Sequence, residues 1–456
     1  MIFRRNRKRL FQCSTIFLLV ALVGCRNASP SAPALDGQLQ AVITTHELFP
    51  LEPVYPQDPA LVRLGQALFF DKVLSGSRDV SCATCHHPLA GSGDGLALPI
   101  GVGGRGLGPT RQISRTAEFV PRNAPDLFNR GYAGWTTMFW DGRVSGTMET
   151  GFISPADDQL PDGLTSVLAV QAMFPVTSRI EMRGMPDSPD GKGGTNELAA
   201  LNDDDFAGVW EALMVRLLKL DPYRTYFAEA YPGTRLNDLS FAHAANALAA
   251  YQTDAFNTVD SPWNRYLAGD ADALSTEAKR GALLFYGEAG CVACHQGALF
   301  TDQQYHNLAV PQFGPGKDDH APFDWGRANE TNSDVDKYAF RTPSLWNVAL
   351  TGPWMHNGAY DALDDVIRHH LSPAEWLRSY EGDHLHPRLV FSIQRDEALY
   401  AEMLVGLDPL VEDAADLRDA DVDALVAFLH ALTAADALNL RDTVPNAVPS
   451  GLPLGD

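Results

Sequence analysis

The chain has 456 residues, of which 45% are hydrophobic, and a formal net charge of −22 at pH 7. This length is more than a single hydrophobic core usually serves, so at least two domains are expected. The acidic balance argues against nucleic-acid binding; it either steers a basic protein partner or simply keeps the protein soluble.

The first 24 residues have the pattern of a secretion signal. Five basic residues between positions 4 and 9 precede an apolar run from Ile16 to Val23, which is shorter than the roughly 20 residues of a membrane span. The run ends in Leu22-Val23-Gly24-Cys25, which is similar to a bacterial lipoprotein signal; the alternative is an ordinary signal with Cys25 incidental. We therefore expect a periplasmic protein held to a membrane only by lipid on Cys25, with a flexible Ala-, Ser- and Pro-rich tether over residues 25–45.

One pentapeptide occurs twice, as Cys82-Ala83-Thr84-Cys85-His86 and, 209 residues later, as Cys291-Val292-Ala293-Cys294-His295. Cys-x-x-Cys-His is the attachment signature of c-type haem, in which both thiols bond to the porphyrin and the histidine ligates the iron. A Cys-x-x-Cys pair alone is also typical of a redox dithiol or half a zinc site, but two complete copies argue against both. The sequence therefore predicts two covalently bound haems.

Each haem motif follows the same apolar helical pattern, at Ala60–Phe70 and at Glu277–Phe285. This repeat predicts a mainly α fold with two cytochrome c-like domains, residues 46–245 and 246–440, and a loose tail over 441–456. Gly- and Asp-rich segments, 91–108 and 184–205, are expected to form long irregular loops around the cofactors. Further helices are expected at Phe206–Leu220, Leu239–Thr253, Asp361–His370 and Asp421–Leu432, and from Pro373 after a capping box at Ser372.

Four further segments follow in order: Arg122-Asn123-Ala124-Pro125, Phe139-Trp140-Asp141-Gly142-Arg143, Phe340–Leu345 and Thr351–Gly358. Together with the haem motifs, they resemble the bacterial di-haem cytochrome c peroxidase family, which includes the MauG-type enzymes, from about Pro59 to Leu432. The resemblance implies that hydrogen peroxide reacts in the N-terminal domain. Electrons from a small periplasmic donor, a cytochrome c or a cupredoxin, would pass through the C-terminal domain, and Trp140 would be the tryptophan between the two haems.

The resemblance also implies a proton-transfer pair beside the first haem. The family pattern is a Gln, then a Pro four residues later and a Glu ten residues later, which Gln171, Pro175 and Glu181 match. Gln171 lies 31 residues after Trp140, farther than in many members, so residues 146–166 would be an inserted loop. A carboxyl held away from water has its charged form disfavoured, so the pKa of Glu181 is expected to rise toward general acid–base use.

Between His87 and His243 the chain has no histidine. Many peroxidases of this family close the first iron at rest with a histidine from that region, and they react only after reduction. His87 adjoins the proximal ligand and is not expected to reach the opposite face of the ring. We therefore expect an open first iron that reacts with peroxide directly, as in the MauG-type enzymes.

The sixth ligand of the second iron is expected to be a histidine. In the family this ligand, a Met or a Tyr, follows the Thr-x-Pro element by seventeen residues, and here the position after Pro353 is His370. His369 is an adjacent competitor, and His356 and Met355 are further alternatives. Ligation by two imidazoles would lower the potential relative to His/Met ligation.

One calcium ion is also implied by the resemblance. The family holds it with an Asn side chain and the carbonyls of the Thr and the Pro, which correspond here to Asn123, Thr351 and Pro353. A hard cation suits such oxygen ligands.

The sequence thus predicts a di-haem peroxidase in which Glu181, Gln171 and Trp140 are catalytic. One alternative is oxidation of a protein side chain, as in MauG. The other is a di-haem electron carrier without catalysis, which requires both irons to be six-coordinate.

Overall fold

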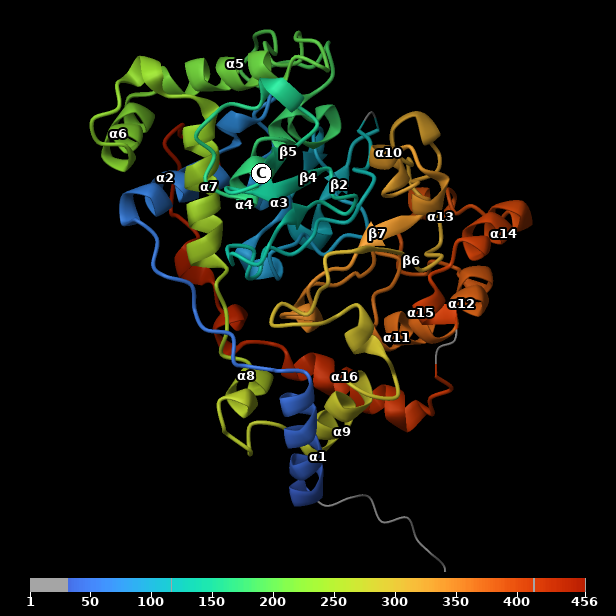
Figure 1. Ribbon diagram of the computed structural model, residues 1–456. Coiled ribbons are helices and arrows are strands. Elements are labelled where there is room, and N and C mark those ends of the chain that lie inside the picture. Colours follow the sequence, from blue (N-terminus) through green and yellow to red (C-terminus); the bar gives the residue numbers. More distant parts are fainter. Residues whose placement is uncertain (1–31, 116, 413–414, 456) are drawn as a thin grey trace, which may run out of the picture.

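The computed structural model describes residues 32–115, 117–412 and 415–455. The predicted signal peptide and Cys25 lie outside the described residues. Figure 1 shows two helical units side by side, connected by irregular chain and small sheets. Within the described ranges, no helix is both long and apolar enough to cross a membrane.

The prediction of a mainly α fold is confirmed. After the N-terminal helix α1 (Ala32–Thr45), the first unit contains α2 (Pro59–Phe70), α3 (Cys82–Cys85), α4 (Val167–Ala172), α5 (Phe206–Leu218), α6 (Asp221–Ala230) and α7 (Phe241–Ala255). The second contains α8 (Pro262–Leu267), α9 (Thr276–Phe285), α10 (Ala328–Thr331), α11 (Leu363–Leu371), α12 (Pro373–Ser379), α13 (Pro387–Val390), α14 (Glu397–Val405), α15 (Pro409–Glu412) and α16 (Asp419–Ala431). All the expected helices are present, and α12 begins at Pro373. The capping box was wrong, because Ser372 makes no side-chain cap hydrogen bond.

The same helix pair forms the core of each unit. Helix α2 packs along α7 in the first, and α9 packs along α16 in the second. Each pair crosses at a glycine: a Cβ on Gly65 would lie 1.9 Å from the carbonyl oxygen of Ala247, and a Cβ on Gly281 would lie 1.9 Å from that of Ala424. Because only glycine permits this approach, the repeat seen in the sequence has a structural cause.

The strands form three small antiparallel sheets: β1 (Gly104–Arg105) with β2 (Gln112–Ile113), β3 (Thr137–Met138) with β4 (Val144–Thr147) and β5 (Gly151–Ile153), and β6 (Tyr305–Asn307) with β7 (Ala339–Arg341). The β3–β4 turn carries the Phe-Trp-Asp-Gly-Arg segment, with Thr137 opposite Ser145. The β4–β5 hairpin begins the segment predicted as an insertion.

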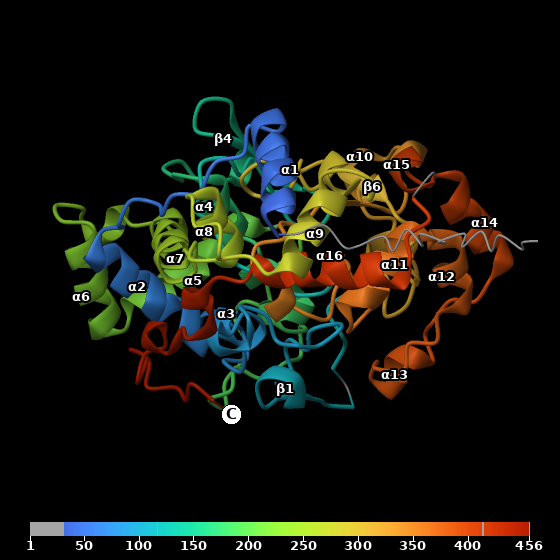
Figure 2. The same cartoon turned by 90° about the horizontal axis from the view of Figure 1, so that it is seen from below.

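The flexible tether predicted over residues 25–45 is wrong for residues 32–45, which form α1. Leu35 and Leu39 are buried. The carboxylate of Asp36 accepts a hydrogen bond from the Tyr266 hydroxyl at 2.8 Å and pairs with the Lys279 amine at 2.7 Å. Helix α1 therefore packs against α9 of the second unit, as Figures 1 and 2 both show.

The predicted loose tail and domain boundary also need correction. Val448 is buried in the core of the first unit, and the Ser450 hydroxyl donates to the buried Asp71 carboxylate at 2.6 Å. Helix α7 crosses the predicted boundary at 245/246, and its apolar residues, together with Phe256 just after it, remain in the first core. The first unit thus extends through α7 and also holds the C-terminal segment.

Candidate functional site

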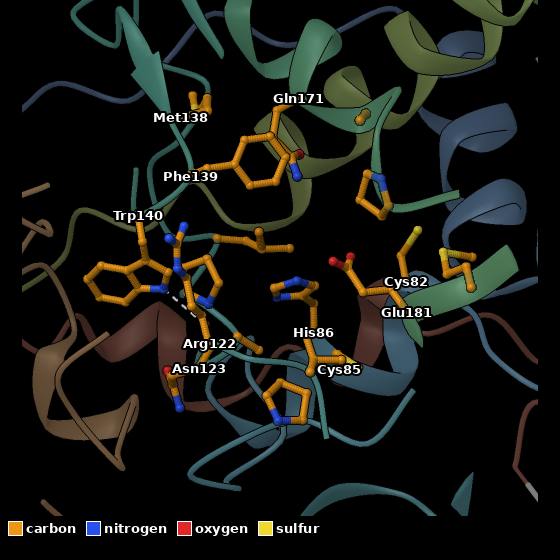
Figure 3. A pocket seen from close by; sticks show the side chains of 18 of the residues that line it. Cys82, Cys85, His86, Arg122, Asn123, Met138, Phe139, Trp140, Gln171 and Glu181 are labelled. Atoms are coloured by element: carbon orange, nitrogen blue, oxygen red, sulfur yellow. Dashed lines mark hydrogen bonds between the residues drawn. The ribbon is translucent and has the colours of Figure 1, made fainter. Parts of the chain in front are cut away.

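The first haem motif lies on the short helix α3. The Ser81 amide donates to the Thr84 hydroxyl at 3.0 Å, which helps to fix the start of this helix. Cys82, Cys85 and His86 line one cavity, called here the first cavity (Figure 3).

The second motif begins with a 3-10 turn, Cys291–Ala293. Its two cysteines and His295 line a separate cavity, called here the second cavity. Both cavities expose more apolar than polar lining. Each motif therefore faces a mainly apolar cavity, which is the environment that a buried porphyrin requires.

Three histidines are held so that Nε2 is the free ring nitrogen. Their Nδ1 atoms lie within hydrogen-bond distance of backbone carbonyl oxygens: His86 of Ser92 at 3.2 Å, His295 of Phe300 at 3.1 Å and His370 of Val366 at 2.8 Å. Because a carbonyl only accepts, Nδ1 carries the proton in each ring. Burial lowers the pKa of all three, that of His295 to about 4, which favours the neutral imidazole that binds iron.

The second cavity brings His370 together with His295. The adjacent His369 does not line this cavity, and both of its nitrogens are engaged, Nδ1 with the Tyr360 hydroxyl and Nε2 with the Leu308 carbonyl, each at 2.8 Å. The other two alternatives, His356 and Met355, do line the cavity. The His356 ring is stacked on Phe340 with centroids 3.5 Å apart.

The first cavity brings together the predicted acid–base residues. Gln171, on α4, and Glu181, on the π-helical turn Arg179–Arg183, both line it, and in Figure 3 their side chains project into the space that His86 enters. Single π-helical turns are frequent at functional sites. Burial raises the pKa of Glu181, the predicted direction, although Arg143, Ser178 and Lys317 act against the shift.

Among the described residues, His86 is the only histidine that lines the first cavity. His87 instead accepts a hydrogen bond from the Leu89 amide at 3.2 Å through its Nδ1. Within the described part of the chain, the first cavity therefore presents Gln171 and Glu181 together with His86, and no second imidazole.

Trp140 lines both cavities. Its indole Nε1 donates to the Asn123 carbonyl at 3.0 Å, and its own carbonyl accepts from the Arg341 amide at 2.8 Å. The β3–β4 turn thus holds the indole between the two candidate haem sites, with hydrogen bonds to both units.

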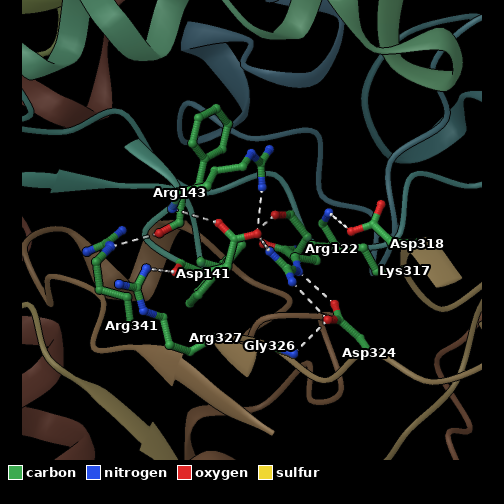
Figure 4. A network of polar contacts seen from close by, with 12 residues as sticks. Arg122, Asp141, Arg143, Lys317, Asp318, Asp324, Gly326, Arg327 and Arg341 are labelled. Atoms are coloured by element: carbon green, nitrogen blue, oxygen red, sulfur yellow. Dashed lines mark hydrogen bonds and ion pairs between the residues drawn. The ribbon is translucent and has the colours of Figure 1, made fainter. Parts of the chain in front are cut away.

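A polar network next to Trp140 joins the two units (Figure 4). The buried guanidinium of Arg122 binds the carboxylates of Asp141 and Asp324, the latter at 2.6 and 2.8 Å. Arg143 also pairs with Asp141 at 2.8 Å. Although burial alone would raise it, these two arginines hold the pKa of Asp141 well below its usual range. Asp324 was not predicted from the sequence, because it lies 202 residues from Arg122 and outside the segments that resemble the family.

Two buried cations fit the acidic groups of a haem. Arg341 lines both cavities, and its guanidinium donates to the carbonyls of Phe139 at 3.0 Å and Thr342 at 3.2 Å. Arg130 lines the first cavity, and its Nη1 is buried without a hydrogen-bond partner in the described part of the chain. Haem propionates would complete such positions, since a buried unpaired donor is costly.

The three predicted calcium ligands meet at the second cavity, which Asn123, Thr351 and Pro353 all line. The Asn123 Nδ2 donates to the carbonyls of Leu96 at 3.0 Å and Ala97 at 3.2 Å. Its Oδ1 is thereby left to accept from another group. This donor set fits a hard cation held by neutral oxygens.

His306 is a further charged group at the second cavity, and no sequence motif indicated it. Its ring lies 3.0 Å from the Asp302 carboxylate and 2.6 Å from the Asp408 carboxylate, and the Asp302 hydrogen bond is the main reason that its pKa rises to about 11. Cys294 lies within 4.8 Å of His306 and Asp302, but it belongs to the haem motif, so we do not assign a metal to this cluster.

Residues 59–272 match the family of di-haem cytochrome c peroxidases. The chain is 30% identical over 368 residues to the methylamine utilization protein MauG of Methylorubrum extorquens, covering 80% of this chain and 83% of that protein. It is also 30% identical over 304 residues to the cytochrome c551 peroxidase of Pseudomonas aeruginosa, covering 67% of this chain and 69% of the relative.

Solved structures give the same result for the fold. The crystal structure of a MauG-like protein associated with microbial copper homeostasis superposes with a TM-score of 0.58 at 25% identity. That match covers 88% of this chain and 97% of the other.

Proposed function

The chain belongs to the family of di-haem cytochrome c peroxidases, which are oxidoreductases, and from this premise we propose that it reduces hydrogen peroxide in the first cavity. The reaction is H2O2 + 2 H+ + 2 e− → 2 H2O. When bound, the haem at His86 supplies the iron at which the O–O bond is cleaved, and the haem at His295 supplies a store of electrons.

In this proposal Glu181 moves the proton. Its carboxylate accepts the proton from one oxygen of peroxide and returns it to the other, which leaves as water. Gln171, which lines the same cavity, orients the peroxide through its side-chain amide. The apolar lining keeps bulk water from competing for the proton.

Trp140 is the proposed relay, because it lines both cavities. Its indole donates to Asn123 of the first unit, and its backbone carbonyl accepts from Arg341 of the second. On the second side, His370 is the proposed sixth ligand, with its Nε2 directed by the bond from Nδ1 to the Val366 carbonyl. Asn123, Thr351 and Pro353 would hold a calcium ion, and the Asn123 carbonyl bonds the relay indole directly.

We also propose a periplasmic location with lipid on Cys25, and a small cytochrome c or cupredoxin as the electron donor. Labelling with radioactive palmitate tests the anchor. The wild-type protein should incorporate label and Cys25→Ser should not.

The observation that carries the proposal is the lining of the first cavity, where Gln171 and Glu181, and no second histidine, accompany His86 among the described residues. The test is peroxide-dependent oxidation of a reduced small cytochrome by the holoenzyme, with Glu181→Gln as the comparison. Absence of turnover in the wild type with every donor tried would contradict the proposal.

A second candidate function is oxidation of a protein side chain. It is favoured by the similarity to a protein named MauG and by a histidine, not a methionine, at position 370. Comparing turnover with small cytochromes and with candidate protein substrates separates the two functions.

A further inference from the structure

A buried tyrosine–histidine pair lies near His370, the proposed ligand of the second haem. The Tyr360 hydroxyl is 2.8 Å from Nδ1 of His369, and Nε2 of His369 is 2.8 Å from the Leu308 carbonyl oxygen. Tyr360 is 4% exposed and His369 is fully buried. The peroxide reaction proposed above uses neither side chain.

The direction of the hydrogen bond follows from the third partner. The Leu308 carbonyl can only accept, so Nε2 of His369 carries a proton and Nδ1 presents a lone pair. Tyr360 is therefore the donor in the O–H···N bond. A phenol in this position keeps its proton at rest and, once oxidised, can pass it to a fixed acceptor without the help of water.

The pair is close to the second cavity. His369 precedes the cavity residue His370 on α11, and the centroids of their rings are 6.4 Å apart. The centroids of the Tyr360 and His369 rings are 5.3 Å apart. In addition, the amide of Trp354, another cavity residue, donates to the Tyr360 carbonyl at 2.7 Å.

Tyr360 differs from its two aromatic neighbours, Tyr380 and Trp376, in its hydrogen bonding and exposure. Tyr380 has its ring centroid 5.6 Å from that of Tyr360 and is also buried, but its hydroxyl has no hydrogen-bond partner in the described structure. Trp376, on α12, lies 5.8 Å from Tyr360 and is partly exposed, so it extends the aromatic series toward the surface. Only Tyr360 of the two tyrosines has an acceptor for its proton.

We propose that Tyr360 is a redox-active residue that gives one electron to the second haem site while its phenolic proton moves to Nδ1 of His369. The inference rests on the proposed function, because hydrogen peroxide is the oxidant. Of the two electrons that convert peroxide to two waters, one comes from Tyr360. The other comes from the external donor or, when no donor is present, from the haem sites themselves. The products are a neutral tyrosyl radical and a His369 imidazolium, and the proton returns when an electron restores the phenol.

This pair would let the enzyme take electrons from a donor that cannot enter either cavity. An electron from an oxidisable side chain of a partner protein at the surface near Trp376 reduces the Tyr360 radical. Large protein substrates would thus be oxidised at the surface near Trp376, away from the point at which small donors deliver their electrons.

The test uses the full-length holoenzyme, mixed with hydrogen peroxide in the absence of any donor and frozen at intervals for electron paramagnetic resonance. A tyrosyl signal is expected in the wild type and in Tyr380→Phe, and it should be lost in Tyr360→Phe. Formation of the signal should be slower in D2O, since a proton moves with the electron.

Haem absorption recorded in the same samples distinguishes a failure of the peroxide reaction from a failure of the redox role of Tyr360. Unchanged haem spectra in the wild type would contradict the proposed function itself. A haem change without a tyrosyl signal, or a signal that survives in Tyr360→Phe, would overturn the redox role of Tyr360 alone. An equal rate of signal formation in D2O would overturn the proton transfer to His369.

Discussion

The two cavities share a scaffold and differ in what faces the motif histidine. In both, a helix pair crosses at a glycine and the motif histidine is oriented by a backbone carbonyl. Besides His86, the first cavity is lined by Gln171 and Glu181, whereas the second cavity is lined by His295 and His370. An open face with an acid–base pair suits chemistry on a small molecule, and a second imidazole suits electron transfer. In the proposed function, a few side chains are therefore enough to give two copies of one scaffold different roles.

The largest expected effect is on the spin state of the second haem. Removing the imidazole of His370 should leave each haem iron with only its motif histidine as a ligand. In His370→Ala the low-spin haem signal should be lost entirely, while the first haem is unchanged. His369→Ala is the matched control and should keep the low-spin signal, because both nitrogens of His369 bond other groups. His370→Met should raise the potential of the second haem, since thioether favours ferrous iron.

A low-spin signal that persists in His370→Ala would show that the ligand lies elsewhere. His356 and Met355, which also line the second cavity, would then be tested next.

Removing the carboxyl group of Glu181 should abolish most peroxide turnover at the first site and leave the second haem site unchanged. Glu181→Gln keeps the shape of the side chain but cannot move a proton, so peroxide turnover should fall by about 10²–10⁴-fold. Haem content and spectra should not change. Glu211→Gln, an exposed position on α5, is the control and should retain full turnover. Normal turnover in Glu181→Gln would make this carboxyl a bystander.

The shared scaffold can be tested at its two glycines. In Gly65→Ala and Gly281→Ala the new methyl group meets a facing backbone carbonyl, so each variant should lose about 1–3 kcal/mol of unfolding free energy. Gly37→Ala in α1 is the control, since a Cβ there would meet nothing within 4 Å. Denaturant titration of the holoprotein measures all three. Equal stability of the three variants would contradict the proposed helix crossings.

The smallest expected effect concerns pH at the first site. Burial raises the pKa of Glu181, so its carboxylate is lost on acidification at a higher pH than in an exposed glutamate, and the rate with peroxide should fall there. Lys317 acts to lower this pKa. Lys317→Met should therefore move the acid limb of the rate profile to higher pH, whereas Lys337→Met, outside the first cavity, should not move it. A shift to lower pH in Lys317→Met would contradict this reading.

Much of the site could be predicted because its residues lie in local patterns. The haem motifs, the lead-in helices and the seventeen-residue offset to His370 are all short-range features, and the structure brings those residues to the two cavities. Asp324 could not be predicted, because its pairing with Arg122 depends on how two distant segments fold together.

Composition was a poor guide at both ends of the described chain. The segment at residues 32–45 was interpreted as a tether from its Ala, Ser and Pro content, although Leu35, Leu39, Val42 and Ile43 recur at helical spacing and pack on the second unit. The C-terminal segment has no such pattern. It is held by Val448 and by the bond from Ser450 to a buried carboxylate, which only the tertiary structure places beside it.

In the proposed function, the first site is open at rest and the second is closed. Stopped-flow mixing of the fully oxidised, unreduced holoenzyme with hydrogen peroxide tests it most directly. We expect an immediate change in the haem absorption, because no imidazole other than His86 lines the first cavity in the described structure. A haem spectrum that changes only after prior reduction of the protein would contradict it.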